Sequence, residues 1–478
     1  MVTTLSFLFF TYFLSGCALF LALQRVVRLP TPEVPRFFWL SLGAGPVAIS
    51  WVVIVSMHLV PGLAPLAYVV LAQVFVITLG AVGWPARNTL QTVYADLMGK
   101  IRSLSAWTGF EWFLGLLLVT LVCANLFLAL ILPIVENDAI QYVLVSQMIL
   151  ERGSLALYPV IEPDPRTGFY AVSSHPLGFM GLYLWTFMAQ GGTEPLALIK
   201  LVSPAYVFYS LLALAAFHWN RARLVIFTAG LVLLATPAYF LQSVFLSIDS
   251  FRIYLLLAAA AWLLETARRA DRHAGLKWGA GLFCGLSMFS HSVNLIFTVP
   301  LLGLGYLAVA AGPLLDRLRT LIVVALAATV VGGERLVSNL LQFGLPVYDF
   351  FPVYEMEFLR HTEHVWGSVG MVTMWDRVVR GLLRGWTALH LAGFSYWIFL
   401  AALVGWVCGW PVSGWAKVEE RMLIVVIGGF YLLAAATVMV GSPVFVTNYR
   451  YMVTVQPFIA SIGAVFLVAV YERYRNRA

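Results

Sequence analysis

Charge is scarce in this sequence. Only 11% of its 478 residues are charged and 61% are hydrophobic, whereas a soluble domain averages roughly 25% charged and 45–50% apolar residues. No low-complexity segment and no stretch with the composition of a soluble domain interrupts the chain. The composition therefore excludes an ordinary soluble fold and indicates an integral membrane protein.

Cysteine is also rare, and its spacing is uninformative. The four cysteines (Cys17, Cys123, Cys284 and Cys408) are scattered through apolar runs, so they form neither a metal-binding pattern nor a disulfide framework. The first apolar segment lacks a basic start and has no small-residue cleavage site before Arg25. We therefore expect a retained membrane helix there and not a removed signal peptide.

Apolar segments long enough to cross a bilayer recur along most of the chain. A helical crossing needs about 20 apolar residues and satisfies its own backbone hydrogen bonds, so we predict an all-α polytopic protein with about 13 spans. The stretch 176–190 is short and indicates a half-span or a surface helix. The predicted spans are 4–24, 37–60, 64–84, 107–135, 195–217, 223–241, 250–266, 277–290, 294–311, 317–336, 387–410, 421–441 and 451–471.

Basic residues predict the orientation of the chain. The net charge of +7 is explained by the excess of Lys and Arg in cytoplasmic loops and not by binding to nucleic acid. All basic patches fall on one side if the N-terminus is outside and the C-terminus is cytoplasmic. These patches are Arg25, Arg28 and Arg36; Arg87, Lys100 and Arg102; Arg221 and Arg223; 267–277; Arg317 and Arg319; and the C-terminal tail.

The same assignment divides the chain into four parts. Residues 1–106 are N-terminal transmembrane helices, and 107–336 are a core module that includes a first extracytoplasmic loop, 136–176. Residues 337–386 form a second large extracytoplasmic loop, and 387–478 are C-terminal transmembrane helices. Polar motifs far apart in sequence are thereby predicted to meet on the outer face of the membrane.

An acidic cluster interrupts "LPIVENDAIQYVLVSQMILERGS", residues 132–154. Asp138 begins an amphipathic stretch that Gly153 can end, and Glu136 lies two residues earlier. Such an acid is often only a helix cap. Alternatively, it is a general base placed to take a proton from an incoming hydroxyl.

Further polar residues stand beside predicted spans. Asp249 directly precedes one, with Arg252 three residues on, which fits either a local ion pair or a polar cavity, because charge near lipid is costly. The sequence context of His175 in "SSHPLGFMGLYLW" favours a structural role over a catalytic one. Small residues at 281, 285 and 287 permit close helix packing, and His291 follows them at an outer turn.

Four cations are candidates for binding phosphate. Arg335 and Arg450 are predicted at outer ends of spans, where the positive-inside rule does not explain them, and Arg binds phosphate oxygens bidentately. His291 is a structural residue or a phosphate donor. Lys200 is predicted a turn or two inside its span.

The order of these motifs resembles that of the GT-C superfamily of polytopic glycosyltransferases, in the bacterial branch related to the protein mannosyltransferase and aminoarabinose transferase families. The similar motifs, over about residues 107–478, are "NDAIQY…ILERGS", "SSHPLGFMGLYLW", "SIDSFRIY", "GLFCGLSMFSH", "FGLPVY" and "NYRYMVTVQP". His291 stands where the family usually has Lys, and "FGLPVY" lacks the usual Asn. Ala139 and Tyr142 set a register that favours Asp138 over Glu136, and the three spans before residue 107 are additional.

The resemblance implies a sugar donor on a polyprenyl phosphate at the outer face of a bacterial inner membrane, and an acceptor hydroxyl on a glycan, lipid or protein. Asp138, or else Glu136, would be the base of an inverting transfer. The donor phosphate would be bound by Arg450, His291, Arg335 and Lys200. The sugar or acceptor would be bound by Asp249, Tyr142, His175, Tyr348 and Tyr449.

Two alternatives stay open. No cofactor is expected, and a divalent metal on Glu136, Asp138 and Asp249 is not favoured, because these residues lack a ligand pattern. The main rival function is a transporter or lipid flippase, which should carry charges near the bilayer midplane, broken helices or internal repeats. A non-catalytic scaffold of an envelope complex is the second rival. Aromatic residues of 337–386 fit sugar stacking or an interfacial belt.

Overall fold

The computed structural model describes residues 2–155, 176–269, 275–344, 388–408, 418–439 and 452–475, together with positions 379 and 383. Within these ranges the chain forms only helices and their connections, which confirms the predicted all-α class. The α-helices are α1 (Val2–Val27), α2 (Val34–Leu59), α3 (Pro65–Gly83), α4 (Thr89–Arg102), α5 (Gly109–Ile131), α6 (Asn137–Arg152), α7 (Gly178–Gln190), α8 (Val202–Phe217), α9 (Arg223–Leu234), α10 (Pro237–Val244), α11 (Asp249–Arg269), α12 (Leu276–Ser290), α13 (Val299–Val309), α14 (Leu314–Gly332), α15 (Glu334–Phe343), α18 (Leu389–Ala392), α19 (Ser395–Val407), α20 (Val418–Met439) and α23 (Gln456–Arg475).

Fewer helices can cross a membrane than the sequence predicted. In the described part of the chain, seven are long and apolar enough, or up to nine if two bent pairs each count as one span. Several predicted spans are short helices: α12 has 15 residues and α19 has 13, against about 20 for a full crossing. The membrane character is supported, and the count of about 13 is not.

Two predicted spans are bent. The stretch 223–241 divides into α9 and α10, which meet at 70°, with Pro237 as the first residue of α10. Proline lacks the amide proton that would continue the preceding helix. The stretch 317–336 divides at Gly332 and Gly333 into α14 and α15, bent by 64°. The predicted boundary of the second large loop, residue 337, therefore falls inside α15.

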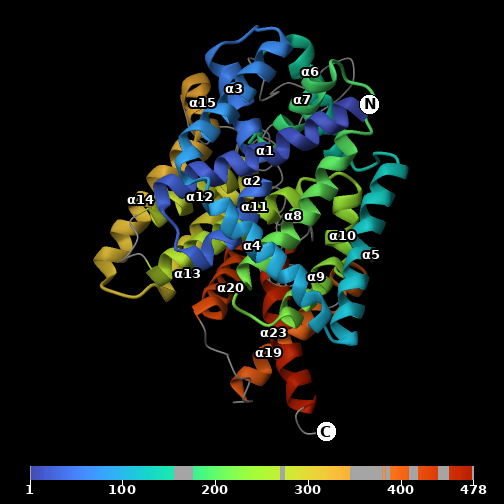
Figure 1. Cartoon of the computed structure of the whole chain (residues 1–478), viewed down its shortest axis with the longest axis vertical. Helices are drawn as coiled ribbons and strands as arrows, with labels where there is room; N and C mark the ends of the chain where they lie inside the picture. Colours follow the sequence, from blue (N-terminus) through green and yellow to red (C-terminus); the bar gives the residue numbers. More distant parts are fainter. Residues whose placement is uncertain are drawn as a thin grey trace.

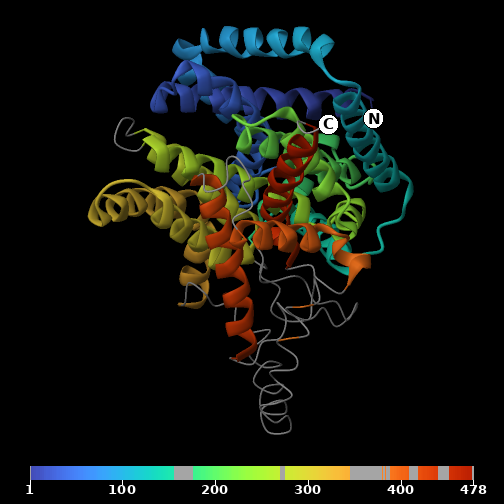
Figure 2. The ribbon, with the colours of Figure 1, turned by 90° about the horizontal axis from the view of Figure 1, so that it is seen from below.

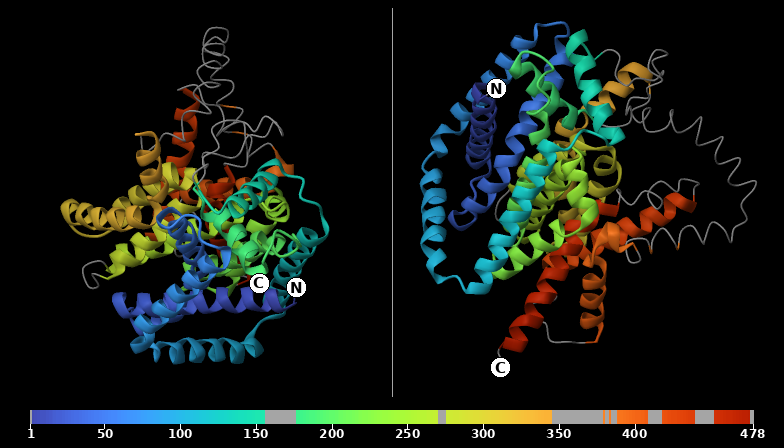
Figure 3. Two further views of the ribbon diagram at one scale, coloured as in Figure 1. Left: turned by 90° about the horizontal axis from the view of Figure 1, so that it is seen from above. Right: turned by 90° about the vertical axis from the view of Figure 1, so that its right-hand side faces the viewer.

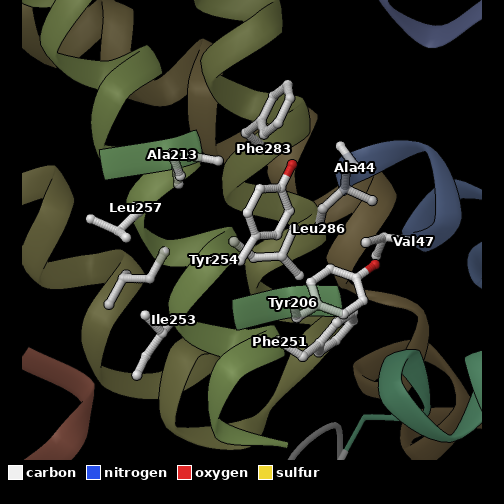
Figure 4. Packing of buried hydrophobic residues seen from close by; sticks show 14 of the residues in the cluster. Ala44, Val47, Tyr206, Ala213, Phe251, Ile253, Tyr254, Leu257, Phe283 and Leu286 are labelled. Atoms are coloured by element: carbon white, nitrogen blue, oxygen red, sulfur yellow. The ribbon is translucent and has the colours of Figure 1, made fainter. Parts of the chain in front are cut away.

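Helix α11 is the centre of the bundle, and its spanning window is buried throughout. Tyr254 on α11 and Tyr206 on α8 both donate their hydroxyls to backbone carbonyls of α2, the second of these to Gly43 at 3.1 Å. Figure 4 shows the two rings among side chains of α2, α8, α11 and α12. The phenol bodies are apolar, and these hydrogen bonds satisfy their buried hydroxyls.

Helices α12 and α14 pack at backbone distance, as the small residues predicted. A Cβ added to Gly281 would lie 2.5 Å from the Cβ of Ala327, and one added to Gly285 would lie 2.7 Å from the carbonyl oxygen of Ala328. Only glycine fits at these two positions without moving the partner helix. The close packing fixes α14 and the start of α15 against the core.

The N-terminal helices α1–α4 form one side of the molecule (Figure 2). They flank the core in the right-hand view of Figure 3. Helix α2 is largely buried and packs on α7, α8 and α12. The additional N-terminal helices are therefore built into the bundle, with α2 reaching its centre.

A buried ionic network joins segments that the sequence placed on one membrane side. Arg36 lies 3.2 Å from Glu33 and 2.9 Å from Glu265, and Arg269 lies 3.1 Å from Glu33 and 2.6 Å from Glu265. Ion pairs of Arg268 with Glu419 and of Arg221 with Glu420 add α20 and the α8–α9 connection. Three of the predicted basic patches thus meet at one end of the bundle, called the network end below.

His218 lies at this end, directly after α8. Burial lowers its pKa from the ordinary 6.5 to about 3; the charges of Arg221 and Arg36 act in the same direction, and Glu419 opposes them. The folded protein thus holds a neutral imidazole that the unfolded chain protonates below about pH 6.5. This contribution to stability is complete above that pH and decreases as the pH falls towards 3.

We expect acidification to lower the melting temperature of the detergent-solubilised protein between pH 7.5 and 5, with His218 contributing up to about 1.4 kcal/mol per pH unit below its unfolded pKa. His218→Gln should make this drop smaller, because glutamine does not titrate. Thermal unfolding of both proteins at several pH values measures the difference. Parallel curves would contradict the assignment.

Candidate functional site

Chain direction places most of the described candidates at the end opposite the network. Helix α11 has 21 residues and rises about 1.5 Å per residue, so Asp249 and Arg269 are about 30 Å apart. Helices α2, α5 and α12 begin towards the network end, whereas α8 ends there just before His218. The chain therefore places His58, Glu136, Lys200 and His291 at the same end of the bundle as Asp249. We call this the site end; Figure 1 shows α6, α7 and α15 in the same upper part of the view.

Glu136, not Asp138, caps helix α6. The Glu136 carboxylate accepts a hydrogen bond of 2.8 Å from the amide of Ala139, and Gly153 ends the helix in the left-handed conformation with φ of 60°. Both ends of the predicted amphipathic helix are confirmed. Asp138 lies in the first turn and is half-buried. The capping role thus belongs to Glu136, and capping does not account for Asp138.

Tyr142 is fully buried, and its ring packs edge-on against Phe179 of α7 with 5.6 Å between ring centres. One turn later Ser146 donates its hydroxyl to the carbonyl of Met180 at 3.1 Å. Helix α7 is buried along almost its whole length, which argues against the surface helix and leaves the half-span of the two alternatives for this stretch. Tyr142 and Ser146 fix α6 on α7 and thereby set the position of the acidic turn.

Asp249 and Arg252 form a buried ion pair at the start of α11. Each side chain is 1% exposed, and the carboxylate lies 2.6 Å from the Nε of Arg252. Ser247 donates to the second carboxylate oxygen at 2.8 Å. The local ion pair that the sequence allowed is confirmed. Its opposite charges and hydrogen bonds offset the large cost of burying either charge alone.

Tyr183 connects the acidic turn with this ion pair. Its hydroxyl donates to the carbonyl of Leu246 at 3.3 Å, three residues before Asp249, and it lies close enough to Glu136 for that carboxylate to act on it electrostatically. The first and third sequence motifs are thereby brought to one place. Sequence reasoning did not single out Tyr183, because it lies within an apolar helix.

His291 ends α12, and its Nδ1 accepts a hydrogen bond of 2.9 Å from the amide of Val293. The ring proton of the neutral imidazole is therefore on Nε2. Asn294 opens a π-helical segment (Asn294–Thr298) and donates to the carbonyl of Arg252 at 3.1 Å. This bond links His291 to the Asp249 ion pair, and π-helical turns are frequent at functional sites.

An apolar groove is lined by residues on both sides of His291 in the sequence. It has a volume of about 320 Å³ and lies between α11, α12, α13 and α14. Its lining includes Met288 and Leu295, one turn before and after His291, and continues past Ala325 and Leu307. Its lining is almost wholly apolar, which suits a hydrocarbon chain.

Lys200 has a structural partner. Its ammonium group donates to the carbonyls of Leu132 at 2.7 Å and Leu130 at 3.3 Å, at the C-terminal end of α5, where the helix dipole favours a cation. Lys200 lies in the turn Ile199–Leu201 before α8. The candidate span begins at Ile199, later than predicted, so Lys200 lies at its start and not a turn or two inside it.

Helix α15 carries its polar side chains inward. Arg335 is 1% exposed and Asn339 is fully buried, whereas Leu341 is 80% exposed. This is the reverse of a helix on a soluble protein, and it suits a helix with lipid on its outer side. Arg335 is thus buried at the site end, as a phosphate-binding cation requires.

The sequence analysis missed the pair His58–Glu334, whose atoms Nε2 and Oε1 lie 2.5 Å apart. It joins the end of α2 to the start of α15. Four predicted site residues, His175, Tyr348, Tyr449 and Arg450, lie outside the described residues, as does most of 337–386 with its aromatic residues. Their predicted roles stay predictions.

No group of three or more His, Cys, Asp and Glu side chains that could hold a metal ion occurs within the described ranges. No protein-family model matches the chain, and neither does any curated protein or solved structure. The function is therefore argued from the site alone.

Proposed function

We propose that the protein is a membrane glycosyltransferase that moves a sugar from a polyprenyl phosphate to an acceptor hydroxyl at the site end of the bundle. The observation that carries the proposal is the apolar groove that reaches Met288 and Leu295, the residues one turn before and one turn after His291. A groove of this kind suits a polyprenyl chain. The polar groups of the site end suit a phosphate and a sugar.

In the proposed reaction Asp138 takes the proton of the acceptor hydroxyl. The acceptor oxygen then attacks the anomeric carbon, the bond from that carbon to the phosphate oxygen breaks, and polyprenyl phosphate leaves without needing a general acid. Attack opposite the leaving group inverts the configuration. The assignment of Asp138 as the general base is supported by the capping hydrogen bond of Glu136, because that bond gives Glu136 a structural role.

The charge that develops on the phosphate needs donors already in place. The Nε2–H of His291 and the buried guanidinium of Arg335 are the described candidates, and Arg450 is the third. The Asp249–Arg252 pair would bind sugar hydroxyls or orient these cations. Lys200 is a weaker candidate for phosphate than it was from sequence, since its donors are directed to carbonyls at the end of α5.

Blocking the groove tests the proposal. Ala325→Trp fills the groove, whereas Leu326→Trp changes the next residue, which is 63% exposed on the same helix. We expect the first variant to bind polyprenyl-phosphate hexoses and pentoses at least about tenfold more weakly, because its indole replaces several methylene contacts worth about 0.8 kcal/mol each. The second should bind them normally. Equal binding by both variants would argue against this groove as the donor site.

The rival reading is a transporter or lipid flippase. It is supported by the two bent helix pairs, since broken helices line many transporter sites. Against it, the ion pairs of the described helices gather at the ends of the bundle and not at mid-depth. Reconstituted vesicles separate the two: translocation of labelled donor lipid without sugar transfer would favour the rival.

A further inference from the structure

The pair His58–Glu334 has the features of a binding site beyond its role as a link between helices. The Glu334 side chain is 7% exposed, and its Oε1 lies 2.5 Å from the Nε2 of His58. Its second oxygen, Oε2, is buried and has no hydrogen-bond partner among the described residues. A buried carboxylate oxygen without a donor is costly, so a ligand that supplies one would be stabilised here.

A second apolar groove is lined in part by α2 and α14, the helices that lead to this pair. It has a volume of about 340 Å³ and is lined only by apolar side chains of α1, α2, α3, α12 and α14, among them Leu23, Trp51, Leu79 and Val331. Trp51 donates its indole N–H to the carbonyl of Val331 at 2.7 Å and so joins α2 to α14 at one side of the groove.

The groove and the pair follow one another along the same two helices. His58 comes two turns after Trp51 on α2, and Glu334 comes three residues after Val331, across the bend between α14 and α15. Two helical turns rise about 11 Å, which is within reach of a lipid headgroup whose chain occupies the groove. An apolar groove and a polar acceptor in this order match a lipid.

We propose that the N-terminal helices and α14–α15 form a second lipid site, and that its occupant is a lipid with a hydroxyl-bearing headgroup. The Oε2 of Glu334 accepts a hydrogen bond from a headgroup hydroxyl, and His58 holds the carboxylate through Oε1. A headgroup hydroxyl supplies the donor that Oε2 lacks without adding a further charge to this buried pair, and burying a charge is costly. The further assignment of this lipid as the acceptor of the transferred sugar rests on the proposed glycosyl transfer. Binding of the lipid at this site does not depend on that reaction.

The test compares two probes that differ only in headgroup hydroxyls: glucosyl-diacylglycerol and diacylglycerol with the same chains. Native mass spectrometry of the full-length protein, with no donor present, measures their binding. Wild type should prefer the glucosyl lipid, and Glu334→Gln should reduce its binding about tenfold, since a neutral amide replaces a charged acceptor. Asp316→Asn, at an acid that is 57% exposed, is the control and should not change binding.

Filling the groove provides a second variant that leaves Glu334 intact. Leu79→Trp should weaken both lipids, whereas Ile77→Trp, at a position 68% exposed on the same helix, should weaken neither. Equal binding of the two lipids by wild type, or an unchanged preference in Glu334→Gln protein that elutes normally on gel filtration, would overturn the proposal. Either result would leave the donor groove and Asp138 untouched, so failure here is distinct from failure of the proposed function.

Discussion

Protein carrying Asp138→Asn should bind a polyprenyl-phosphate sugar normally and transfer the sugar about a thousandfold more slowly than wild type, because general base catalysis contributes 10²–10⁴ in rate. Asparagine has nearly the shape of aspartate, and Glu136 still caps α6, so the helix should be intact. Release of polyprenyl phosphate from labelled donor, with acceptor supplied by native membranes, measures the loss.

Glu136→Ser is the matched control. Serine is a good N-cap, so this variant retains the helix start and removes the competing carboxylate. We expect its transfer rate to stay within a fewfold of wild type. Full activity of Asp138→Asn, combined with loss of activity in Glu136→Ser, would reverse the assignment of the base.

The second large effect concerns stability. Glu265→Ala should destabilise the protein by about 3–5 kcal/mol, the cost found when one partner of a buried ion pair is removed. Glu265 is 1% exposed and lies within 2.9 Å of Arg36 and 2.6 Å of Arg269. Its loss leaves the buried Arg36 with Glu33 as the remaining ion-pair partner among the described residues. Thermal unfolding in detergent, with the fraction of monodisperse protein, measures the effect.

Two further variants test the cause. Asp316→Ala removes an exposed ion pair with Arg319 and should change the melting temperature little, because exposed pairs are worth about 0–1 kcal/mol. Replacing both Arg36 and Glu265 by Met should be better tolerated than Glu265→Ala, since no single charge is left buried. A melting temperature of Glu265→Ala equal to wild type would show that the network is not a stabilising core.

Local signals in the sequence predicted much of this fold. Gly153 and the acids near Asp138 define the two ends of α6, since a left-handed glycine and a side-chain acceptor are chemical properties of single residues. Gly281 and Gly285 predicted close helix packing, and the structure gives α14 as the partner, because no side chain fits between the two helices. The convergence of Arg36, Arg221 and the end of α11 followed from counting charges between spans.

Other features depend on tertiary contacts that no local pattern encodes. His58 and Glu334 are 276 residues apart, and neither stands in a recognisable motif. From sequence, Lys200 was a candidate for binding phosphate. Only the fold shows that the carboxyl end of α5 lies beside it and supplies its hydrogen-bond partners. Hydropathy alone also predicted a span over α12, which has only 15 residues, because a short buried helix is as apolar as one that crosses a bilayer.

The two ends of the bundle therefore differ in chemistry. At the network end, acids and arginines neutralise one another in the described contacts and hold α2, α11 and α20 together. At the site end lie a carboxylate, a histidine with its proton on Nε2 and a buried arginine, and an apolar groove reaches the residues one turn before and after that histidine. The proposed function needs this second set to meet around one lipid-linked sugar.

The most direct test is an experimental structure of the Asp138→Asn protein with a polyprenyl-phosphate sugar bound. The account predicts that the prenyl chain lies in the groove between α12, α13 and α14, that the phosphate lies beside His291 and Arg450, and that the anomeric carbon faces Asn at position 138. A phosphate bound at the network end beside Arg36, or a sugar on the far side of the bundle from α6, would contradict it.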